Sequence, residues 1–275
     1  MTDTALPYAE VIGDPIAHSK SPLIHNFWLN KLGIEAEYRK THVKPAELAA
    51  YFLKRRADPD WLGCNVTIPH KVAVMEYVSD PGRVGDLIGA MNTIACETGG
   101  PLIGTNTDAG GFLGPLLSSG FKGRSVCIIG AGGAARAILY ALGQIGVREL
   151  TVMARDTAKG QALLDRAGLA GTVISLDAPL PAADLVVNSS PLGMAGQPPL
   201  DVDLAPLPSH SVVYDIVYAP LDTPLLVQAR ERGLAAIDGL EMLIGQAALA
   251  FDIFFDAQPA REHDAELRAL LTAEG

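Results

Sequence analysis

Residues 126–135 constrain the fold most, because an apolar run there ends in a glycine-rich turn and an alanine-rich apolar segment follows. A strand, a tight turn and a helix start in this order form the phosphate-binding element of dinucleotide-binding folds. Gly130 allows the tight turn, Gly132 lets the backbone approach a pyrophosphate, and Ala135 suits close packing of helix on strand. The pattern predicts a nucleotide site formed by Gly130, Ala131, Gly132, Gly133 and Ala134 at a helix N-terminus. The alternative is a strand–helix turn that needs glycine only for its geometry.

The next strand, expected over residues 149–153, ends where such folds distinguish their cofactors. A carboxylate at this position accepts hydrogen bonds from the ribose 2′-hydroxyl of NAD, whereas an arginine accommodates the 2′-phosphate of NADP. Ala154 takes the acidic position, Arg155 follows it, and Lys159 adds a second positive charge. These residues favour NADP, but the carboxylate of Asp156 leaves NAD open. The alternative is that Arg155 and Lys159 are solvated residues of a loop and helix start.

The composition indicates a globular protein with a sizeable core. The chain has 275 residues, of which 49% are hydrophobic, and a formal net charge of −10. This length suits one large domain or two modest ones. The sequence contains no basic tract, so nucleic acid is not expected as a partner. The N-terminus lacks the pattern of a signal peptide, and no apolar stretch is suited to cross a membrane.

The cysteines and histidines do not suggest a disulfide or a metal site. Cys64, Cys96 and Cys127 are scattered in apolar contexts without a C-x-x-C pair, which is typical of reduced thiols in a cytoplasmic protein. No His, Cys or Asp residues cluster at the spacing of metal ligands. We therefore expect a cytoplasmic protein without a metal.

Short apolar strands alternate with helices in both halves of the chain, which predicts α/β domains with largely parallel sheets. In the first half, strands are expected over residues 8–12, 37–42 and 63–68, with helices over 22–32, 45–57 and from 71 onward. In the second half, strands are expected near 126–129, 149–153, 172–175, 184–187, 212–215 and 234–237. An apolar helix over 241–255 is expected to return to the first domain. The predicted organisation is a domain of residues 1–107 plus 241–275 and a Rossmann domain of residues 108–240.

Polar clusters follow several apolar segments of the first half. Ser19 and Ser21 lie in a loop before an expected helix, where they suit a carboxylate or sugar-like hydroxyls. The alternative for Ser21 is that it caps the helix starting at Pro22. Asn92 and Thr107 are suited to hydrogen-bond a polyhydroxylated ring, and Asp108 is suited to accept from a hydroxyl and to pair with Lys71. Each of them alone is an ordinary turn residue.

Lys71 belongs to the segment NVTIPHK at residues 65–71, in which Pro69 is expected to open a helix. A lysine in the first turn meets the positive end of the helix dipole, which disfavours its charged form and suits proton transfer. The alternative is a lysine that points into water.

Together these segments resemble the shikimate dehydrogenase family over essentially the full chain. The resemblance is carried by six motifs in order: GDPIAHSKSP (13–22), NVTIPHK (65–71), MNT (91–93), NTD (106–108), GAGGAA (130–135) and DGLEMLIGQA (238–247). It implies reversible NADPH-dependent reduction of 3-dehydroshikimate to shikimate in aromatic amino-acid biosynthesis. The implied fold has an N-terminal substrate domain with a mostly parallel sheet and a Rossmann domain that binds NADP.

The resemblance also implies roles for individual residues. Lys71 matches the catalytic lysine, and Asp108 matches the aspartate that works beside it. The substrate carboxylate is assigned to Ser19 and Ser21, with Tyr218 nearby; the substrate hydroxyls to Thr67, Asn92 and Gln246; and the cofactor to Arg155, Lys159 and Gly239 in addition to the glycine-rich turn.

Two departures from the family pattern leave alternatives open. Ala154-Arg155-Asp156 stands where members often have Asn-Arg-Thr, and Glu241 stands where some have glycine. One alternative is therefore a quinate/shikimate dehydrogenase that uses NAD, and another is a nucleotide-binding relative without catalysis. The expected partner is a small-molecule substrate, and the chain is expected to be a monomer or a homodimer.

Overall fold

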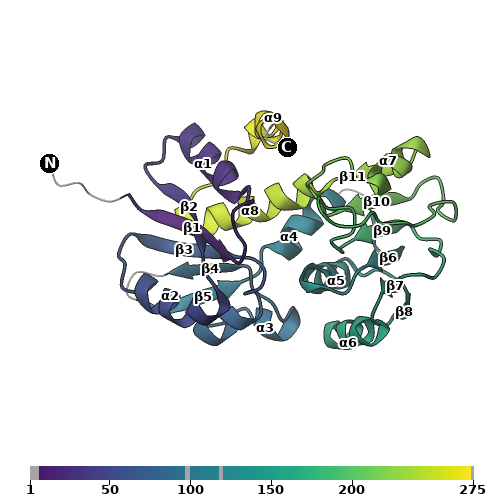
Figure 1. The fold of residues 1–275 in the computed structure, drawn as a ribbon, viewed down its shortest axis with the longest axis horizontal. Helices are drawn as coiled ribbons and strands as arrows, with labels where there is room; N and C mark the ends of the chain where they lie inside the picture. Colours follow the sequence, from purple (N-terminus) through teal and green to yellow (C-terminus); the bar gives the residue numbers. More distant parts are fainter. Residues whose placement is uncertain (1–5, 97–99, 118–119, 274–275) are drawn as a thin grey trace. The chain divides into compact units, whose positions relative to one another are not determined.

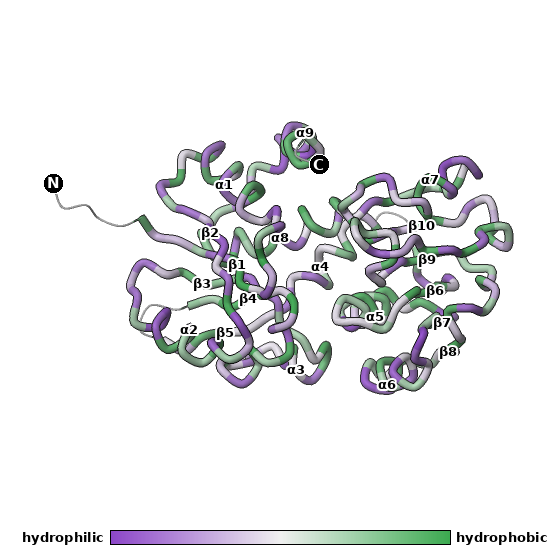
Figure 2. Tube along the Cα trace, viewed as in Figure 1, coloured by the Kyte–Doolittle hydropathy of each residue, from purple (hydrophilic) through white to green (hydrophobic). Residues whose placement is uncertain are grey.

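A computed structural model describes residues 6–96, 100–117 and 120–273 of the chain. The described residues form two compact units, each built on its own sheet (Figure 1). Unit 1 contains the residues up to Thr107 and those from Gln246, and unit 2 contains Asp108–Gly245. Hydrophobic residues gather along the strands and on the helices that cover them (Figure 2).

The sheet of unit 1 has the strand order β2-β1-β3-β4-β5. Its strands are β1 (Tyr8–Gly13), β2 (Glu37–His42), β3 (Trp61–Val66), β4 (Thr93–Cys96) and β5 (Leu102–Thr105). β1 pairs in parallel with β2 and with β3, whereas β4 is antiparallel to both of its neighbours. Four strands thus share one direction. The mostly parallel sheet of the prediction is confirmed, but β4 and β5 were not anticipated.

Helices cover the sheet of unit 1. They are α1 (Ser21–Leu32), α2 (Leu48–Arg55), α3 (Val84–Leu87), the part of α8 (Gly239–Phe255) from Gln246, and α9 (Asp264–Ala273). Short 3₁₀ helices occupy Pro45–Glu47, Ala73–Tyr77 and Arg261–His263. The α8 side chain Phe251 packs edge-on against Trp28 of α1, with ring centroids 5.5 Å apart. Both rings are fully buried. The C-terminal helix therefore returns to the first unit, as predicted.

The sheet of unit 2 has the order β11-β10-β9-β6-β7-β8, and all of its pairings are parallel. Its strands are β6 (Ser125–Ile129), β7 (Glu149–Ala154), β8 (Thr172–Ser175), β9 (Leu185–Asn188), β10 (Val212–Asp215) and β11 (Ala235–Ile237). Its helices are α4 (Asp108–Leu113), α5 (Gly133–Ile145), α6 (Thr157–Ala167) and α7 (Pro224–Glu231), with a 3₁₀ helix at Gly114–Leu116. This is the doubly wound order of Rossmann folds, and the strand order reverses between β6 and β9.

The helix predicted from Lys71 onward is wrong. Residues 68–72 form a turn, and only the short 3₁₀ helix Ala73–Tyr77 follows. The Lys71 carbonyl accepts the N–H of Met91 at 2.7 Å, and the N–H of Met75 bonds instead to Val72 at 3.2 Å. The contact with Met91 therefore occupies the Lys71 carbonyl oxygen, which would accept the Met75 N–H in an α-helix. The helix-dipole argument for Lys71 does not hold, because no α-helix begins there.

No helix among the described residues is long and apolar enough to cross a membrane. The same residues contain no group of three or more His, Cys, Asp or Glu side chains arranged to hold a metal ion.

Candidate active site

The glycine-rich turn of unit 2 lies between β6 and α5, where the strand order of the sheet reverses. Gly130 has a φ of +113°, which side chains rarely tolerate. A Cβ on Gly130 would lie 2.9 Å from both Ser189 Oγ and the Ser190 backbone nitrogen. The neighbouring loop of the chain itself therefore requires glycine at this position.

Gly132 and Gly133 differ from Gly130, because a Cβ on either would meet no atom of the chain within 4 Å. Gly132 is the N-cap of α5, and no side chain caps this helix. Its first turn also lacks acidic residues, so no carboxylate of that turn offsets the positive end of the helix dipole. The glycine-rich turn at residues 130–134, called the dinucleotide cradle below, therefore fits the diphosphate of a dinucleotide.

Arg155 follows the buried strand end Ala154 and is exposed, as is Lys159 in the first turn of α6. Asp156 between them is the N-cap of α6, and its carboxylate accepts the Lys159 N–H at 3.0 Å. The carboxylate that left NAD open at the sequence level thus has a structural role as a helix cap.

Ser19 and Ser21 lie together at the start of α1. The Ser19 hydroxyl oxygen accepts the Ser21 N–H at 3.3 Å, and Lys20, not Ser21, is the N-cap residue. The alternative that Ser21 caps this helix is therefore wrong: Ser21 is already its first residue. Ser21 is buried, with 8% of its surface exposed.

Basic side chains hold the loop that leads to these serines. Lys40 donates to the Ala17 carbonyl at 2.7 Å, and His42 pairs with Asp14 at 2.6 Å. Lys20 donates to the Leu271 carbonyl of α9 at 3.3 Å. The loop is therefore fixed from β2 on one side and from the C-terminal helix on the other.

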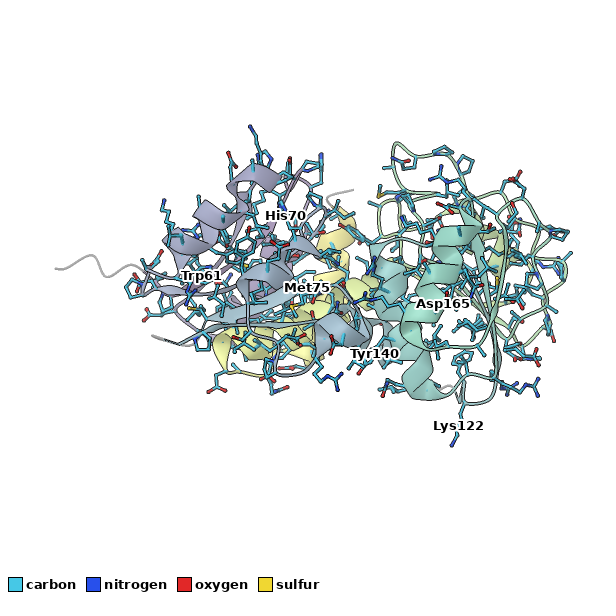
Figure 3. The ribbon with its side chains drawn as sticks, turned by 90° about the horizontal axis from the view of Figure 1, so that it is seen from below. Trp61, His70, Met75, Lys122, Tyr140 and Asp165 are labelled. Atoms are coloured by element: carbon cyan, nitrogen blue, oxygen red, sulfur yellow. The ribbon has the colours of Figure 1, made fainter. Side chains whose placement is uncertain are left out.

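Thr67 and Lys71, both half-buried, belong to one turn that backbone contacts fix in place. The Thr67 N–H donates to the Ile12 carbonyl at 3.0 Å, and the Lys71 carbonyl accepts the Met91 N–H at 2.7 Å. His70 (labelled in Figure 3) bonds through Nε2 to the Val43 carbonyl at 2.6 Å, so this nitrogen carries the proton. The residue is 1% exposed. The sequence analysis did not single out His70, although it directly precedes Lys71.

Asn92 is the centre of a buried polar network in unit 1. Its Oδ1 accepts the Thr107 N–H at 2.7 Å, and its Nδ2 donates to Thr107 Oγ1 at 3.0 Å and to Gln246 Oε1 at 3.4 Å. Asn65 supports it by donating to the Asn92 carbonyl at 3.2 Å. The structure thus brings together Asn92 and Gln246, which are 154 residues apart in sequence.

Asp108 directly follows Thr107 of this network and begins α4. It is 6% exposed, and its position at the helix start is favourable for a carboxylate. Asp108 therefore begins unit 2 immediately after the chain leaves the Asn92 network.

Tyr218 and Gly239 occupy neighbouring segments of unit 2. Tyr218 is half-buried, and burial raises the pKa of its hydroxyl. A Cβ on Gly239 would lie 2.5 Å from the carbonyl oxygens of Ile216 and Val217. Glycine at 239 therefore lets α8 begin directly against the loop that carries Tyr218.

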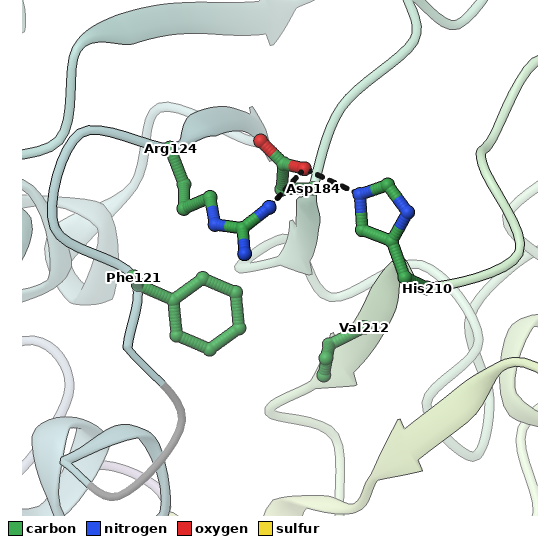
Figure 4. Close-up of a pocket in the computed structure, with 5 residues that line it drawn as sticks. All are labelled: Phe121, Arg124, Asp184, His210 and Val212. Carbon is green, nitrogen blue, oxygen red and sulfur yellow. Dashed lines mark hydrogen bonds and ion pairs between the residues drawn. The ribbon is translucent and has the colours of Figure 1, made fainter.

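A pocket of about 320 Å³ lies at the opposite edge of the unit 2 sheet, lined by Phe121, Arg124, Asp184, His210 and Val212 (Figure 4). Asp184 precedes β9 and His210 precedes β10, so the pocket faces the amino ends of the strands. Ligands of doubly wound sheets bind at the carboxyl ends. This pocket is therefore not the dinucleotide cradle.

Comparisons with known proteins agree with this arrangement. A model of the shikimate dehydrogenase substrate binding domain matches residues 11–94, and a shikimate/quinate 5-dehydrogenase model matches residues 116–192. A model of the shikimate 5′-dehydrogenase C-terminal domain matches residues 239–266. Both units are thus covered by domains of one family.

Individual relatives match nearly the whole chain. A shikimate dehydrogenase (NADP(+)) of Sphingopyxis alaskensis is 59% identical over 269 residues, covering 98% of each chain. Shikimate 5-dehydrogenase of Thermus thermophilus, solved in complex with NADP(H) and shikimate, is 33% identical with a TM-score of 0.84, covering 97% of this chain and 100% of that one. A 5-ketofructose reductase of Gluconobacter, solved without ligand, has a TM-score of 0.89 at 28% identity, covering 98% of this chain and 99% of that one. The fold alone therefore does not fix the substrate.

Proposed function

The chain belongs to the shikimate dehydrogenase family, and we propose that it catalyses the reversible NADPH-dependent reduction of 3-dehydroshikimate to shikimate in aromatic amino-acid biosynthesis. The observation that carries this proposal is the 59% identity to a shikimate dehydrogenase (NADP(+)) across 98% of both chains. Identity of that extent spans the substrate-side motifs and the dinucleotide cradle together.

In this proposal the substrate and the dinucleotide bind to different domains. Residues 1–107 with 241–275 bind the substrate, and residues 108–240 bind the dinucleotide. The compact units support this division, since the Asn92 network lies in unit 1 and the glycine-rich turn lies in unit 2.

NADPH, when bound, supplies the hydride that reaches the substrate ketone carbon. The diphosphate is held by the N–H groups of the turn at residues 130–134, where the side-chain positions of Gly132 and Gly133 are open. Arg155 and Lys159 hold the 2′-phosphate, and the backbone of Gly239 contributes a further contact. The exposure of Arg155 and the capping role of Asp156 support NADP over NAD.

Lys71 acts on the substrate oxygen. Negative charge grows on the carbonyl oxygen as its carbon is reduced, and the Lys71 ammonium stabilises that charge and donates the proton that completes the alcohol. Asp108 accepts a hydrogen bond from the same hydroxyl. The hydrogen bonds that hold the turn at residues 67–71 support this role, because they fix the backbone that carries Lys71.

The remaining side chains orient the ring. The substrate carboxylate is assigned to Ser19, Ser21 and Tyr218, and the ring hydroxyls to Thr67, Asn92 and Gln246. The contact between Asn92 and Gln246 supports a shared subsite for these two amides.

The alternative activity is that of a quinate/shikimate dehydrogenase using NAD, because one matching family model covers both substrates. The test is oxidation of shikimate and of quinate, each with NADP⁺ and with NAD⁺. The proposal expects turnover chiefly with shikimate and NADP⁺. Turnover chiefly with quinate and NAD⁺ would favour the alternative, and no turnover by folded protein that binds nucleotide would favour a relative without catalysis.

We also propose a cytoplasmic location for this enzyme, as a monomer or a homodimer. The three cysteines are free thiols, and Cys64 and Cys127 are buried. Burial raises the pKa of the Cys127 thiol to about 12, so it is an unreactive core residue.

A further inference from the structure

Two fully buried polar side chains, Asp215 and Asn188, end the neighbouring strands β10 and β9 of unit 2. They lie opposite each other in the strand register, and Asn188 Nδ2 donates to Asp215 Oδ1 at 2.9 Å. Asp215 is 1% exposed and Asn188 is 0% exposed. Neither residue was singled out in the sequence analysis.

Each of these side chains also holds its own loop. Asp215 Oδ1 accepts the Val217 N–H at 3.0 Å, and Asn188 Oδ1 accepts the Ser190 N–H at 3.0 Å. An Asp or Asn side chain bonded to the backbone two residues later forms an Asx turn. One hydrogen bond, from Asn188 to Asp215, therefore links two Asx turns on adjacent strands.

The second oxygen of Asp215 reaches the start of α7. Asp215 Oδ2 accepts the Thr223 hydroxyl at 2.7 Å, and Thr223 is the N-cap of that helix. Among the described residues Asp215 has three hydrogen-bond donors and no cationic partner. Burial raises the pKa of its carboxyl group, which the three donors oppose. An acidic group in such a place costs stability, so a role in positioning accounts for it better than stabilisation of the core.

The two linked turns lie at the edge of the sheet that holds the dinucleotide cradle. Ser189, next to Asn188, donates its N–H to the Ile129 carbonyl at 2.8 Å and lies against Gly130. Val217 precedes Tyr218. Because Arg155 follows β7 on the far side of β6, the adenosine end is assigned to that side and the nicotinamide end to β9 and β10.

We propose that Asp215 is a positioning residue for hydride transfer, which fixes the loops at residues 188–190 and 215–218 through the linked turns and touches neither cofactor nor substrate. The inference rests on the proposed function, because it takes NADPH as the ligand of this edge. A misplacement of about 1 Å by a residue remote from the chemistry can cost roughly 10²-fold in rate.

The test compares Asp215→Asn with Asp184→Asn, a matched substitution at the opposite edge of the same sheet. Asparagine keeps the volume of Asp215 but replaces one acceptor oxygen by a donor, so it cannot accept from all three partners. We expect kcat of Asp215→Asn to fall by roughly 10- to 100-fold with a KM for 3-dehydroshikimate within about threefold of the parent, while kcat of Asp184→Asn is unchanged. An unchanged kcat for Asp215→Asn, or an equal loss in both variants, would overturn the proposal.

Asn188→Ala breaks the same link from the other side and serves if Asp215→Asn does not fold. It should lower kcat by a similar factor, and the double variant should lose little more, because both changes remove one interaction. A kcat of Asn188→Ala at the parental value would overturn the proposal.

Nucleotide binding separates this inference from the activity itself. If the parent enzyme does not reduce 3-dehydroshikimate, the role of Asp215 can still be tested by ligand binding. The two ligands are NADPH and adenosine 2′,5′-bisphosphate, which lacks the nicotinamide half. We expect Asp215→Asn to weaken the affinity for NADPH roughly tenfold and to leave the affinity for the adenosine fragment unchanged. Equal effects on both ligands, or none on either, would contradict the proposed role of Asp215.

Discussion

The Asp156 carboxylate accepts the backbone N–H of Lys159 at 3.0 Å and thereby caps α6. Its negative charge stabilises the positive end of that helix. Arg155 beside it is exposed, as its proposed contact with the 2′-phosphate requires. The Ala-Arg-Asp sequence is thus compatible with NADP, because the acidic residue has a function in the helix.

Replacing Arg155 by alanine should therefore raise KM for NADPH and leave KM for NADH unchanged. The loss of a charge-assisted hydrogen bond predicts a rise of roughly 10- to 100-fold. Steady-state kinetics with both cofactors measure it. The control is Asp156→Asn, which keeps a capping side chain without the charge and should not raise KM for NADPH. Equal effects of Arg155→Ala on both cofactors would contradict the assignment.

Lys71→Ala should lower kcat by at least about 10²-fold with a smaller effect on KM, because it removes the group proposed to donate the proton. Lys54→Ala, which removes an exposed lysine of α2, is the matched control and should retain full activity. A Lys71→Ala variant with the parental kcat would remove Lys71 from the chemistry.

The buried imidazole of His25 should make the fold less stable in acid. This ring is fully buried, makes no hydrogen bond, and stacks on Tyr38 with ring centroids 3.9 Å apart. Burial lowers its pKa to about 3 from the ordinary 6.5. The unfolded chain takes up a proton as the pH falls below 6.5, and the folded chain does so only near 3, so folding stability is lost across that range.

Replacing His25 by leucine should remove about one proton from this pH dependence. Urea unfolding between roughly pH 6 and 4 should show a slope smaller by about 1.4 kcal/mol per pH unit. Leu53→Ala, at an exposed position whose side chain does not titrate, should leave the slope unchanged. Identical slopes for His25→Leu and the parent would show that the buried imidazole is protonated in the folded state.

The Asp184 carboxylate should stabilise the fold without affecting catalysis. It pairs with His210 at 2.7 Å (Figure 4). It also accepts the Ser125 N–H at 2.8 Å. These partners hold its pKa below the ordinary range, so its contribution to stability is present above about pH 4 and is lost as the pH falls further.

Asp184→Asn should lower the free energy of unfolding by about 1 kcal/mol at neutral pH, with kcat unchanged. The difference from the parent should narrow as the pH falls below about 4, because the unfolded parental chain takes up a proton there that the folded carboxylate resists. Denaturant unfolding at the two pH values measures this. A constant difference across pH would show that the charge of Asp184 is not what stabilises the fold.

Local patterns in the sequence predicted most of the fold. The alternation of strands and helices indicated two α/β domains, and the glycine pattern placed the start of α5. Both features depend on residues close together in the chain, so they are visible without tertiary information.

The failures share one cause, which is contacts between distant residues. The turn at Lys71 depends on the N–H of Met91 taking the Lys71 carbonyl, and no property of residues 65–75 reveals that bond. Likewise Asn188 and Asp215 read as ordinary strand ends, because their link joins residues 27 positions apart. Buried polar networks therefore had to come from the structure.

The activity proposed for this chain is the reduction of 3-dehydroshikimate with NADPH. The most direct test is the initial rate of reduced-cofactor consumption with 3-dehydroshikimate, measured with NADPH and with NADH at equal concentration. We predict rapid turnover with NADPH and much slower turnover with NADH. No turnover with NADPH, or faster turnover with NADH, would contradict this activity.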